Sequence, residues 1–250
     1  MTHINMDYFY DHAMALIDKV RDTQSENIRK ASEIFANSIA QDGVVQIFGS
    51  GHSVGFAAEC TGRAGSLLPF HMIESSDFVV KGMTTLADFK DQTNIFERRP
   101  GIADKLYDLH DIKPQDAFIV ISNSGINGLV IDLALTAKAK GHKVIVITSM
   151  EHTLAEPSRH PSGKKLYELA DVVIDNCGPR GDALLETGDG PEKICSLSSI
   201  TGIYIAQSLT IEITRILDEK GVEAPLLYSS EVKGYQEHNQ ALYKKYKGRI

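Results

Sequence analysis

Val44-Val45-Gln46-Ile47-Phe48-Gly49-Ser50-Gly51-His52-Ser53 joins a short apolar run to a turn of glycines and serines. The run is typical of a buried strand, and helical spacing follows from residue 53 to about residue 64. Residues 117–121 repeat the pattern and lead into Ser122-Asn123-Ser124-Gly125 and a helix over 129–140. A third apolar strand, over 143–147, ends at Thr148-Ser149. Each of the three predicted strands is therefore followed by a small polar loop.

Strands and helices alternate along the middle of the chain. Shorter apolar runs over 67–73 and 172–174 add two strands to the three above. Strands that are apolar on both faces and alternate with helices indicate a parallel sheet covered by helices on both sides. We therefore predict an α/β fold in three layers, with a five-stranded parallel sheet flanked by helices. Such sheets bind ligands beyond the carboxyl ends of their strands, where the polar loops are expected.

Helical spacing also marks both ends of the chain. Apolar residues over 13–20 and 28–39 predict two N-terminal helical segments, with Thr23 or Ser25 as the N-cap of the second. Further helices are expected over 101–109, 192–217 and 236–246, whereas residues 74–99 show no pattern. We divide the chain into N-terminal helices that pack on the core or on a second subunit (1–41), a ligand-binding domain (42–220) and a C-terminal segment (221–250).

The composition narrows the class of protein. The chain has 250 residues and a formal net charge of −7, which argues against a nucleic-acid partner. It contains no run of 18 apolar residues, and its first seven residues do not resemble a signal peptide. We therefore expect a cytoplasmic protein that binds neither nucleic acid nor membrane. The basic residues 243–249 are expected to form a solvated end.

The cysteines Cys60, Cys177 and Cys195 are far apart and form no paired motif. This spacing suggests neither a disulfide framework nor a zinc site, so we expect three buried apolar residues. The histidines His152 and His160, eight positions apart, also lack the spacing of metal ligands on a helix. We predict no metal and no cofactor.

Each polar loop has the chemistry to bind an anion. Glycine lets the backbone approach a ligand closely, helix N-termini offer free amides, and hydroxyl groups add neutral donors. Two such loops on neighbouring strands can close around one phosphate. The alternative for any single loop is a tight turn with an N-cap. The candidate binding residues on the three loops include Gly51, Asn123, Thr148 and Ser149.

A dinucleotide site is the competing interpretation of the first loop. Gly49, Gly51 and Gly55 depart by one position from the G-x-G-x-x-G fingerprint, and Glu74 follows the second strand, where a ribose-binding acid would lie. Such a fold does not need the second serine loop at 122–125, so we rank this interpretation lower. No Walker P-loop sequence is present.

These loops, taken together, resemble the SIS (sugar isomerase) domain. The resemblance covers residues 40–218 and rests on Gly49-Ser50-Gly51-His52-Ser53, on Ile121-Ser122-Asn123-Ser124-Gly125 and on the strand that ends at Thr148-Ser149. It implies a five-stranded parallel sheet and a homodimer or homotetramer. It also implies that the phosphate of a phosphorylated sugar is held by Ser50, Ser53, Ser122, Ser124 and Asn127. Residues 149–182 resemble a bacterial branch related to phosphoheptose isomerases and muramic-acid phosphate etherases.

Aldose–ketose isomerisation needs a base that removes a proton next to a carbonyl. Glu59 is the candidate, because it lies six residues after Ser53, about 9 Å along a helix. Residues 58–63 also resemble the A-E-x-x-T-G-R stretch of phosphoheptose isomerases, although Glu59 follows the loop serine more closely than their glutamate does. The alternative is a helix carboxylate paired with Arg63 at i+4.

Two histidines are candidates to assist the base. His52 lies inside the first loop, and His238 lies in the C-terminal helix, which in related proteins can reach the site of a neighbouring subunit. The alternatives are a solvated loop residue and a surface histidine. We predict a phosphosugar-binding protein that acts as an aldose–ketose isomerase. A lyase acting on an ether-linked phosphosugar and a non-catalytic phosphosugar sensor remain alternatives.

Overall fold

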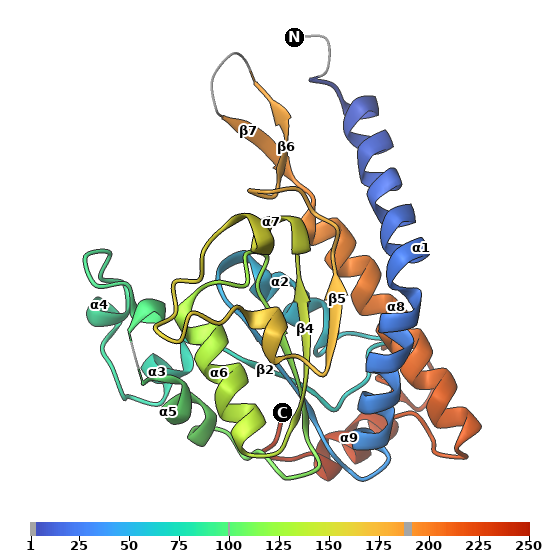
Figure 1. The fold of residues 1–250 in the computed structure, drawn as a ribbon. Helices are drawn as coiled ribbons and strands as arrows, with labels where there is room; N and C mark the ends of the chain where they lie inside the picture. Colours follow the sequence, from blue (N-terminus) through green and yellow to red (C-terminus); the bar gives the residue numbers. More distant parts are fainter. Residues whose placement is uncertain (1–3, 100, 188–191) are drawn as a thin grey trace.

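The computed structural model describes residues 4–99, 101–187 and 192–250. Residues 1–3 of the predicted N-terminal helices and Pro100, after the irregular stretch, lie outside the described residues. The described residues form one parallel sheet in the order β2-β1-β3-β4-β5, with helices on both sides (Figure 1). Its strands are β1 (Val45–Gly49), β2 (Phe70–Ile73), β3 (Ala117–Ile121), β4 (Lys143–Thr148) and β5 (Val172–Asp175). The predicted five-stranded α/β fold is confirmed.

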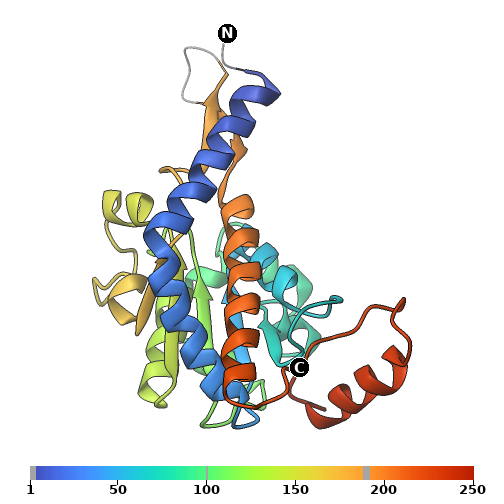
Figure 2. The same cartoon turned by 90° about the vertical axis from the view of Figure 1, so that its right-hand side faces the viewer.

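The alternation of side chains along each strand builds two cores. Val45 and Ile47 face the core shared with α1 (Met6–Ile39) and α8 (Ser198–Glu219), which lie side by side in Figure 2. Phe48 and Phe118 face the opposite core, shared with α5 (Ala103–Asp108) and α6 (Gly128–Ala139). The three central strands β1, β3 and β4 are buried on both faces, which explains why they read as continuous apolar runs.

The N-terminal region is one helix rather than the two predicted segments. α1 runs for 34 residues from its N-cap Asn5. Thr23 does not act as a cap, because its hydroxyl donates to the Lys19 carbonyl 2.7 Å away, one turn earlier. The Ser25 hydroxyl likewise donates to the Arg21 carbonyl. Ser and Thr can satisfy their hydroxyls in this way within a continuous helix, which the sequence pattern does not distinguish from a cap.

The predicted helix over 192–217 is also wrong at its start. Residues Lys193–Ser196 form β7, which pairs antiparallel with β6 (Ala183–Glu186), and α8 begins only at Ser198. The hairpin and the first turns of α1 project at the same end of the molecule (Figures 1 and 2). Ile194 and Leu197 mimic the helical spacing of the apolar residues that follow them. Cys195, with a φ of 66°, takes a conformation that a helix does not allow.

Several other predicted elements are shorter than expected. The helix after the first loop is a 3₁₀ turn, η1 (Gly51–Ser53), followed by α2 (Val54–Cys60). The strand predicted from residue 67 begins at Phe70, because Pro69 precedes it and Leu67 instead bridges to Leu226. The remaining elements are α3 (Asp77–Val80), α4 (Leu86–Phe89), η2 (Phe96–Arg98), α7 (Met150–Ala155), η3 (Leu166–Leu169) and α9 (Tyr235–Lys245).

The basic C-terminal tail is solvated only in part: its three lysines are exposed as the sequence suggests, whereas Tyr246 and Arg249 are not. Tyr246 is 1% exposed and packs with Val44, Leu68 and Leu227 beside the amino ends of the strands. Arg249 donates from Nη2 to both carboxylate oxygens of the fully buried Asp116, at 2.6 and 2.7 Å. The tail therefore closes the edge of the sheet opposite to the polar loops.

The described ranges contain no helix that is long and apolar enough to cross a membrane. Cys60 and Cys177 are buried as expected, whereas Cys195 is exposed on β7 because the hairpin carries it away from the core. The predicted division of the chain into three segments stays a prediction.

Candidate functional site

The strand order places a switch point between β1 and β3. β2 lies on one side of β1, and the chain then crosses to the other side to form β3. The loops after the neighbouring strands β1 and β3 therefore leave the sheet side by side. In open parallel sheets, ligands bind in the crevice at such a point. The order β2-β1-β3-β4-β5 also differs from the 3-2-1-4-5-6 order of dinucleotide-binding folds. The dinucleotide interpretation is therefore not supported.

The first loop is tight because Gly49 ends β1. A Cβ atom at Gly49 would lie 2.7 Å from the backbone oxygen of Ser53, so no larger residue fits. Gly51 takes a left-handed φ of 58° and starts η1. Neither Ser50 nor Ser53 uses its hydroxyl to cap η1 or α2 in the described chain. These hydroxyls remain available to a ligand.

Hydrogen bonds of buried hydroxyl groups fix the conformation of the second loop, which follows β3. Ser122 Oγ accepts from the Gly125 amide at 3.1 Å, and Thr148 Oγ1 donates to the Ser122 carbonyl at 2.7 Å. A Cβ atom at Gly125 would lie 2.9 Å from Thr153 Oγ1, and its φ of 61° also favours glycine. Ser122 and Thr148, both predicted to bind phosphate, instead use their hydroxyls to shape the loop.

The third loop does not present its serine to the site. Ser149 is fully buried, and its Oγ donates to the Gly178 carbonyl at 2.6 Å and accepts from the His152 amide. Asn127, at the start of α6, accepts from Arg159 through Oδ1. Six of the predicted phosphate ligands stay at least partly accessible, whereas Ser122, Thr148 and Ser149 are buried. The accessible six are Ser50, Gly51, Ser53, Asn123, Ser124 and Asn127.

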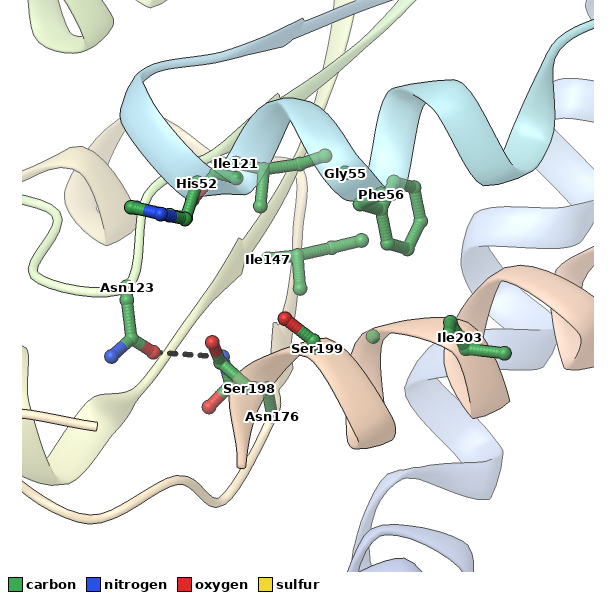
Figure 3. A pocket seen from close by; sticks show the side chains of 12 residues that line it. His52, Gly55, Phe56, Ile121, Asn123, Ile147, Asn176, Ser198, Ser199 and Ile203 are labelled. Carbon is green, nitrogen blue, oxygen red and sulfur yellow. Dashed lines mark hydrogen bonds between the residues drawn. The ribbon is translucent and has the colours of Figure 1, made fainter. Parts of the chain in front are cut away.

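A cavity of about 150 Å³ opens at the switch point (Figure 3). It is lined by the predicted residues His52, Ser53 and Asn123, and by Asn176, Ser198 and Ser199, which sequence reasoning missed. Its floor and walls are apolar and come from Ile121, Ile147, Gly55, Phe56, Gly202 and Ile203. Among the described residues that line it, His52 is the one titratable side chain. The other donors that face a ligand here are amides and hydroxyls, which are neutral.

Asn123 and Asn176 form an amide pair at the carboxyl ends of β3 and β5. Asn176 Nδ2 donates to Asn123 Oδ1 at 2.9 Å, and Asn176 Oδ1 accepts from the Gly178 amide (Figure 3). The pair engages the oxygen of Asn123, so its Nδ2 group remains to donate to a ligand. The sequence around Asn176 shows no strand-loop-helix pattern, so it does not mark Asn176 as a site residue. The hydrogen bond to Asn123 brings Asn176 into the site.

The start of α8 forms the far wall of the cavity. Asp182 accepts from the Ser198 amide and hydroxyl at 2.8 and 2.7 Å, which caps the helix. This carboxylate offsets the positive end of the helix. An anion is therefore favoured on the side of the serine loops rather than at α8. Ser199 is exposed, so its hydroxyl can form a hydrogen bond with a neutral group of a ligand.

Glu59 lies on α2 beyond the cavity, where α2 and α8 run next to each other. It is one helical turn after Gly55, and Gln207 is one turn after Ile203, about 5.4 Å beyond the lining residues. Glu59 Oε1 accepts from Gln207 Nε2 at 2.5 Å and pairs with Arg63. The predicted base is thus next to the cavity but does not line it, and the alternative Arg63 pair is present.

His238 lies at the opposite edge of the sheet. Its ring stacks on Tyr228 with centroids 3.7 Å apart, and Nε2 lies 2.9 Å from the Leu226 carbonyl. Leu226 pairs with Leu67, just before the amino end of β2. Within one chain, His238 therefore cannot assist chemistry at the serine loops. It fixes α9 to the sheet, a role that its position in an amphipathic helix does not reveal.

A parallel sheet in this order, with amide and hydroxyl groups at its switch point, defines a doubly wound α/β fold. Residues 8–149 match the family model of the SIS domain. The chain belongs to the SIS-domain family, and the resemblance found in the sequence is confirmed. A UPF0309 protein of Listeria monocytogenes is 37% identical over 97% of both chains. Another UPF0309 protein, of Geobacillus thermodenitrificans, is 36% identical over 98% of this chain and 96% of its own.

Solved structures show the same fold at low sequence identity. The phosphoheptose isomerase GmhA of Neisseria gonorrhoeae has a TM-score of 0.54 at 17% identity, covering 83% of this chain and 95% of its own. A putative phosphosugar isomerase of Bacteroides fragilis has a TM-score of 0.56 at 16% identity over 93% and 94%. The Vibrio vulnificus NanR protein, complexed with ManNAc-6P, has a TM-score of 0.52 at 11% identity over 96% and 67%.

Proposed function

We propose that this protein binds a phosphorylated sugar at the switch point between β1 and β3. The observation that carries the proposal is the set of neutral donors that converge there from separate segments, above all Ser53 and the Nδ2 group of Asn123. A sugar phosphate needs many such donors, and amides and hydroxyls can bind its anion without a cation. The phosphate would lie on the 50–53 and 122–127 loops, away from Asp182. The sugar would extend toward α8.

The comparisons support the ligand class. NanR is seen with ManNAc-6P, and two of the neighbours with the same fold are described as sugar-phosphate isomerases. The volume of about 150 Å³ is below the roughly 300–1,000 Å³ of larger ligand pockets, which favours a single sugar over a dinucleotide.

The reaction that we propose is aldose–ketose isomerisation with Glu59 as the base. Gly55 and Phe56 of α2 line the cavity beside the serine loops, and this carboxylate follows Gly55 by one helical turn. A phosphate at the loops would therefore direct the reacting end of an open-chain sugar toward Glu59. His52, at the mouth of the cavity, is placed to assist in opening the ring.

Replacement of Glu59 by Gln tests the assignment. Glu59→Gln removes the base but keeps the shape of the side chain, so kcat should fall by roughly 10²–10⁴-fold. The Kd for the same sugar phosphate should stay within about twofold, because binding rests on the loops. A panel of pentose, hexose and heptose phosphates, assayed by thermal shift and then by NMR of the products, identifies the substrate.

The control is Glu26→Gln, an exposed carboxylate on α1 that pairs with Lys30. Undiminished turnover in Glu59→Gln would remove Glu59 from the mechanism. A product lighter than its substrate would identify the ether lyase, since isomerisation conserves mass.

A non-catalytic phosphosugar sensor is the second candidate. The observation that favours it is the position of Glu59, which pairs with Arg63 and does not line the cavity. A carboxylate in this state can act simply as a structural link between two helices. Tight binding of one sugar phosphate, with no turnover of any member of the panel, would select this candidate.

A further inference from the structure

We infer that Gln207 is a positioning residue for Glu59, an assignment that rests on the proposed isomerase function. Gln207 lies on α8, 148 positions from Glu59 in the sequence, and donates from Nε2 to Glu59 Oε1 at 2.5 Å. The contact joins α2 to α8, the two helices that contribute Phe56 and Ile203 to the lining of the cavity. It therefore connects the candidate base to the opposite wall of the site.

The two donors on Glu59 reach the same oxygen. Gln207 and Arg63 both contact Oε1, and no other side-chain hydrogen bond engages the Glu59 carboxylate within the described residues. Oε2 is then the oxygen left free to remove a proton. Because Arg63 and Glu59 share one segment of chain, their bond alone leaves the carboxylate free to move with α2. Gln207 adds the constraint from a second element.

The position of Gln207 continues a stripe along α8. Ser199 and Ile203 line the cavity, and Gln207 follows at the next helical turn on the same face. Gly55 and Glu59 repeat this spacing on α2. A Cβ atom added at Gly55 would meet no other atom within 4 Å, so there is open space beside α2 at this position.

The chemistry of the amide suits the role. Gln207 donates a neutral hydrogen bond, so it orients the carboxylate without adding a charge beside the phosphosugar. A base displaced by about 1 Å from a productive geometry can lose on the order of 10²-fold in rate. Loss of the amide should therefore reduce kcat and leave the binding of the sugar phosphate intact.

The test compares Gln207→Met, which keeps the length but loses the donor, with Gln207→Lys, which restores a donor. Gln207→Met should lower kcat by about 10- to 100-fold with KM within about twofold, and Gln207→Lys should recover part of the rate. Gln207 is exposed, so both variants should fold. Gln236→Met, on an exposed side chain of α9, is the matched control.

A double-mutant cycle separates positioning from a general structural effect. In the Glu59→Gln background, Gln207→Met should cause no further loss of kcat, since the group that it orients is gone. Additive losses, or full kcat in Gln207→Met, would overturn the inference while leaving the proposed function in place. Full turnover in Glu59→Gln alone would instead overturn the proposed base, and the inference with it.

Discussion

His71 is a histidine at the sheet edge whose environment disfavours its charged form. It lies on β2 opposite Gln46, and its Nδ1 donates to Gln46 Oε1 at 2.7 Å. Its ring meets that of His110 edge to face, with centroids 4.9 Å apart. Burial, followed by the charge of His110, lowers the pKa of His71 to about 4, although the carboxylates of Asp77 and Asp116 act in the opposite direction.

The lowered pKa predicts a loss of stability in acid. An unfolded histidine has a pKa of about 6.5, so the unfolded chain binds more protons than the folded one below that pH. The free energy of unfolding should therefore decrease as the pH falls from about 6.5 toward 4, by about 2 kcal/mol between pH 6.5 and 4.5. Urea unfolding of the natural protein and of His71→Gln at the two pH values measures it. An equal decrease in both proteins would show that other groups are responsible.

The surroundings of a loop serine decide whether it lines the cavity. Ser53 and Ser149 both follow strands and precede short helices, so the sequence presents them as equivalents. Ser149 is buried against the Gly178 carbonyl, whereas Ser53 lines the cavity. The difference comes from residues 176–178, which cover the third loop and not the first. A local pattern cannot contain this information, because it depends on a distant segment.

At the scale of elements, α8 depends on a cap supplied from outside the helix. Asp182 holds the Ser198 amide and hydroxyl, and it precedes the hairpin rather than the helix. Asp182→Ala should lower the free energy of unfolding by about 1 kcal/mol, because the first-turn donors lose their acceptor. Asp182→Asn keeps an acceptor oxygen and should lose less. Chemical denaturation measures both, and equal losses would point to the negative charge of Asp182 rather than to its acceptor oxygen.

The buried strands and α6 were predictable, because apolar runs and glycine-rich turns dominate those segments. The hairpin β6–β7 was not, since β7 is exposed throughout and shows no buried face. The same error concealed Ser198 and Ser199, because a helix assumed to start at residue 192 hides its real N-terminus. The half of the site on β1 and β3 was therefore predicted, and the half on α8 was missed.

At the scale of the whole molecule, Arg249 links the C-terminal tail to the centre of the sheet. Besides Asp116, its guanidinium donates to the Asp42 carbonyl at 2.8 Å, and its side chain is 12% exposed. Asp116 also accepts from the Val44 and Lys113 amides, at 2.9 and 3.0 Å, so one carboxylate joins the tail to the entry of β1.

Arg249→Ala should lower the free energy of unfolding by about 3 kcal/mol, because it leaves the buried Asp116 carboxylate without its cation. The melting temperature and the urea midpoint measure the change. Lys247→Ala, an exposed residue of the same tail, is the control and should change little. A double variant, Arg249→Met with Asp116→Asn, should recover part of the loss if charge is the cause. No recovery would assign the loss to packing.

The exposure of Cys195 gives this chain a natural attachment point for an optical probe. Burial raises the pKa of the Cys60 and Cys177 thiols, so both resist alkylation, whereas Cys195 lies open on β7. A maleimide dye would therefore label Cys195 selectively among the three cysteines, without any mutation. That position is three residues from Ser198 at the cavity wall, so the fluorescence of the dye would report ligand entry in real time.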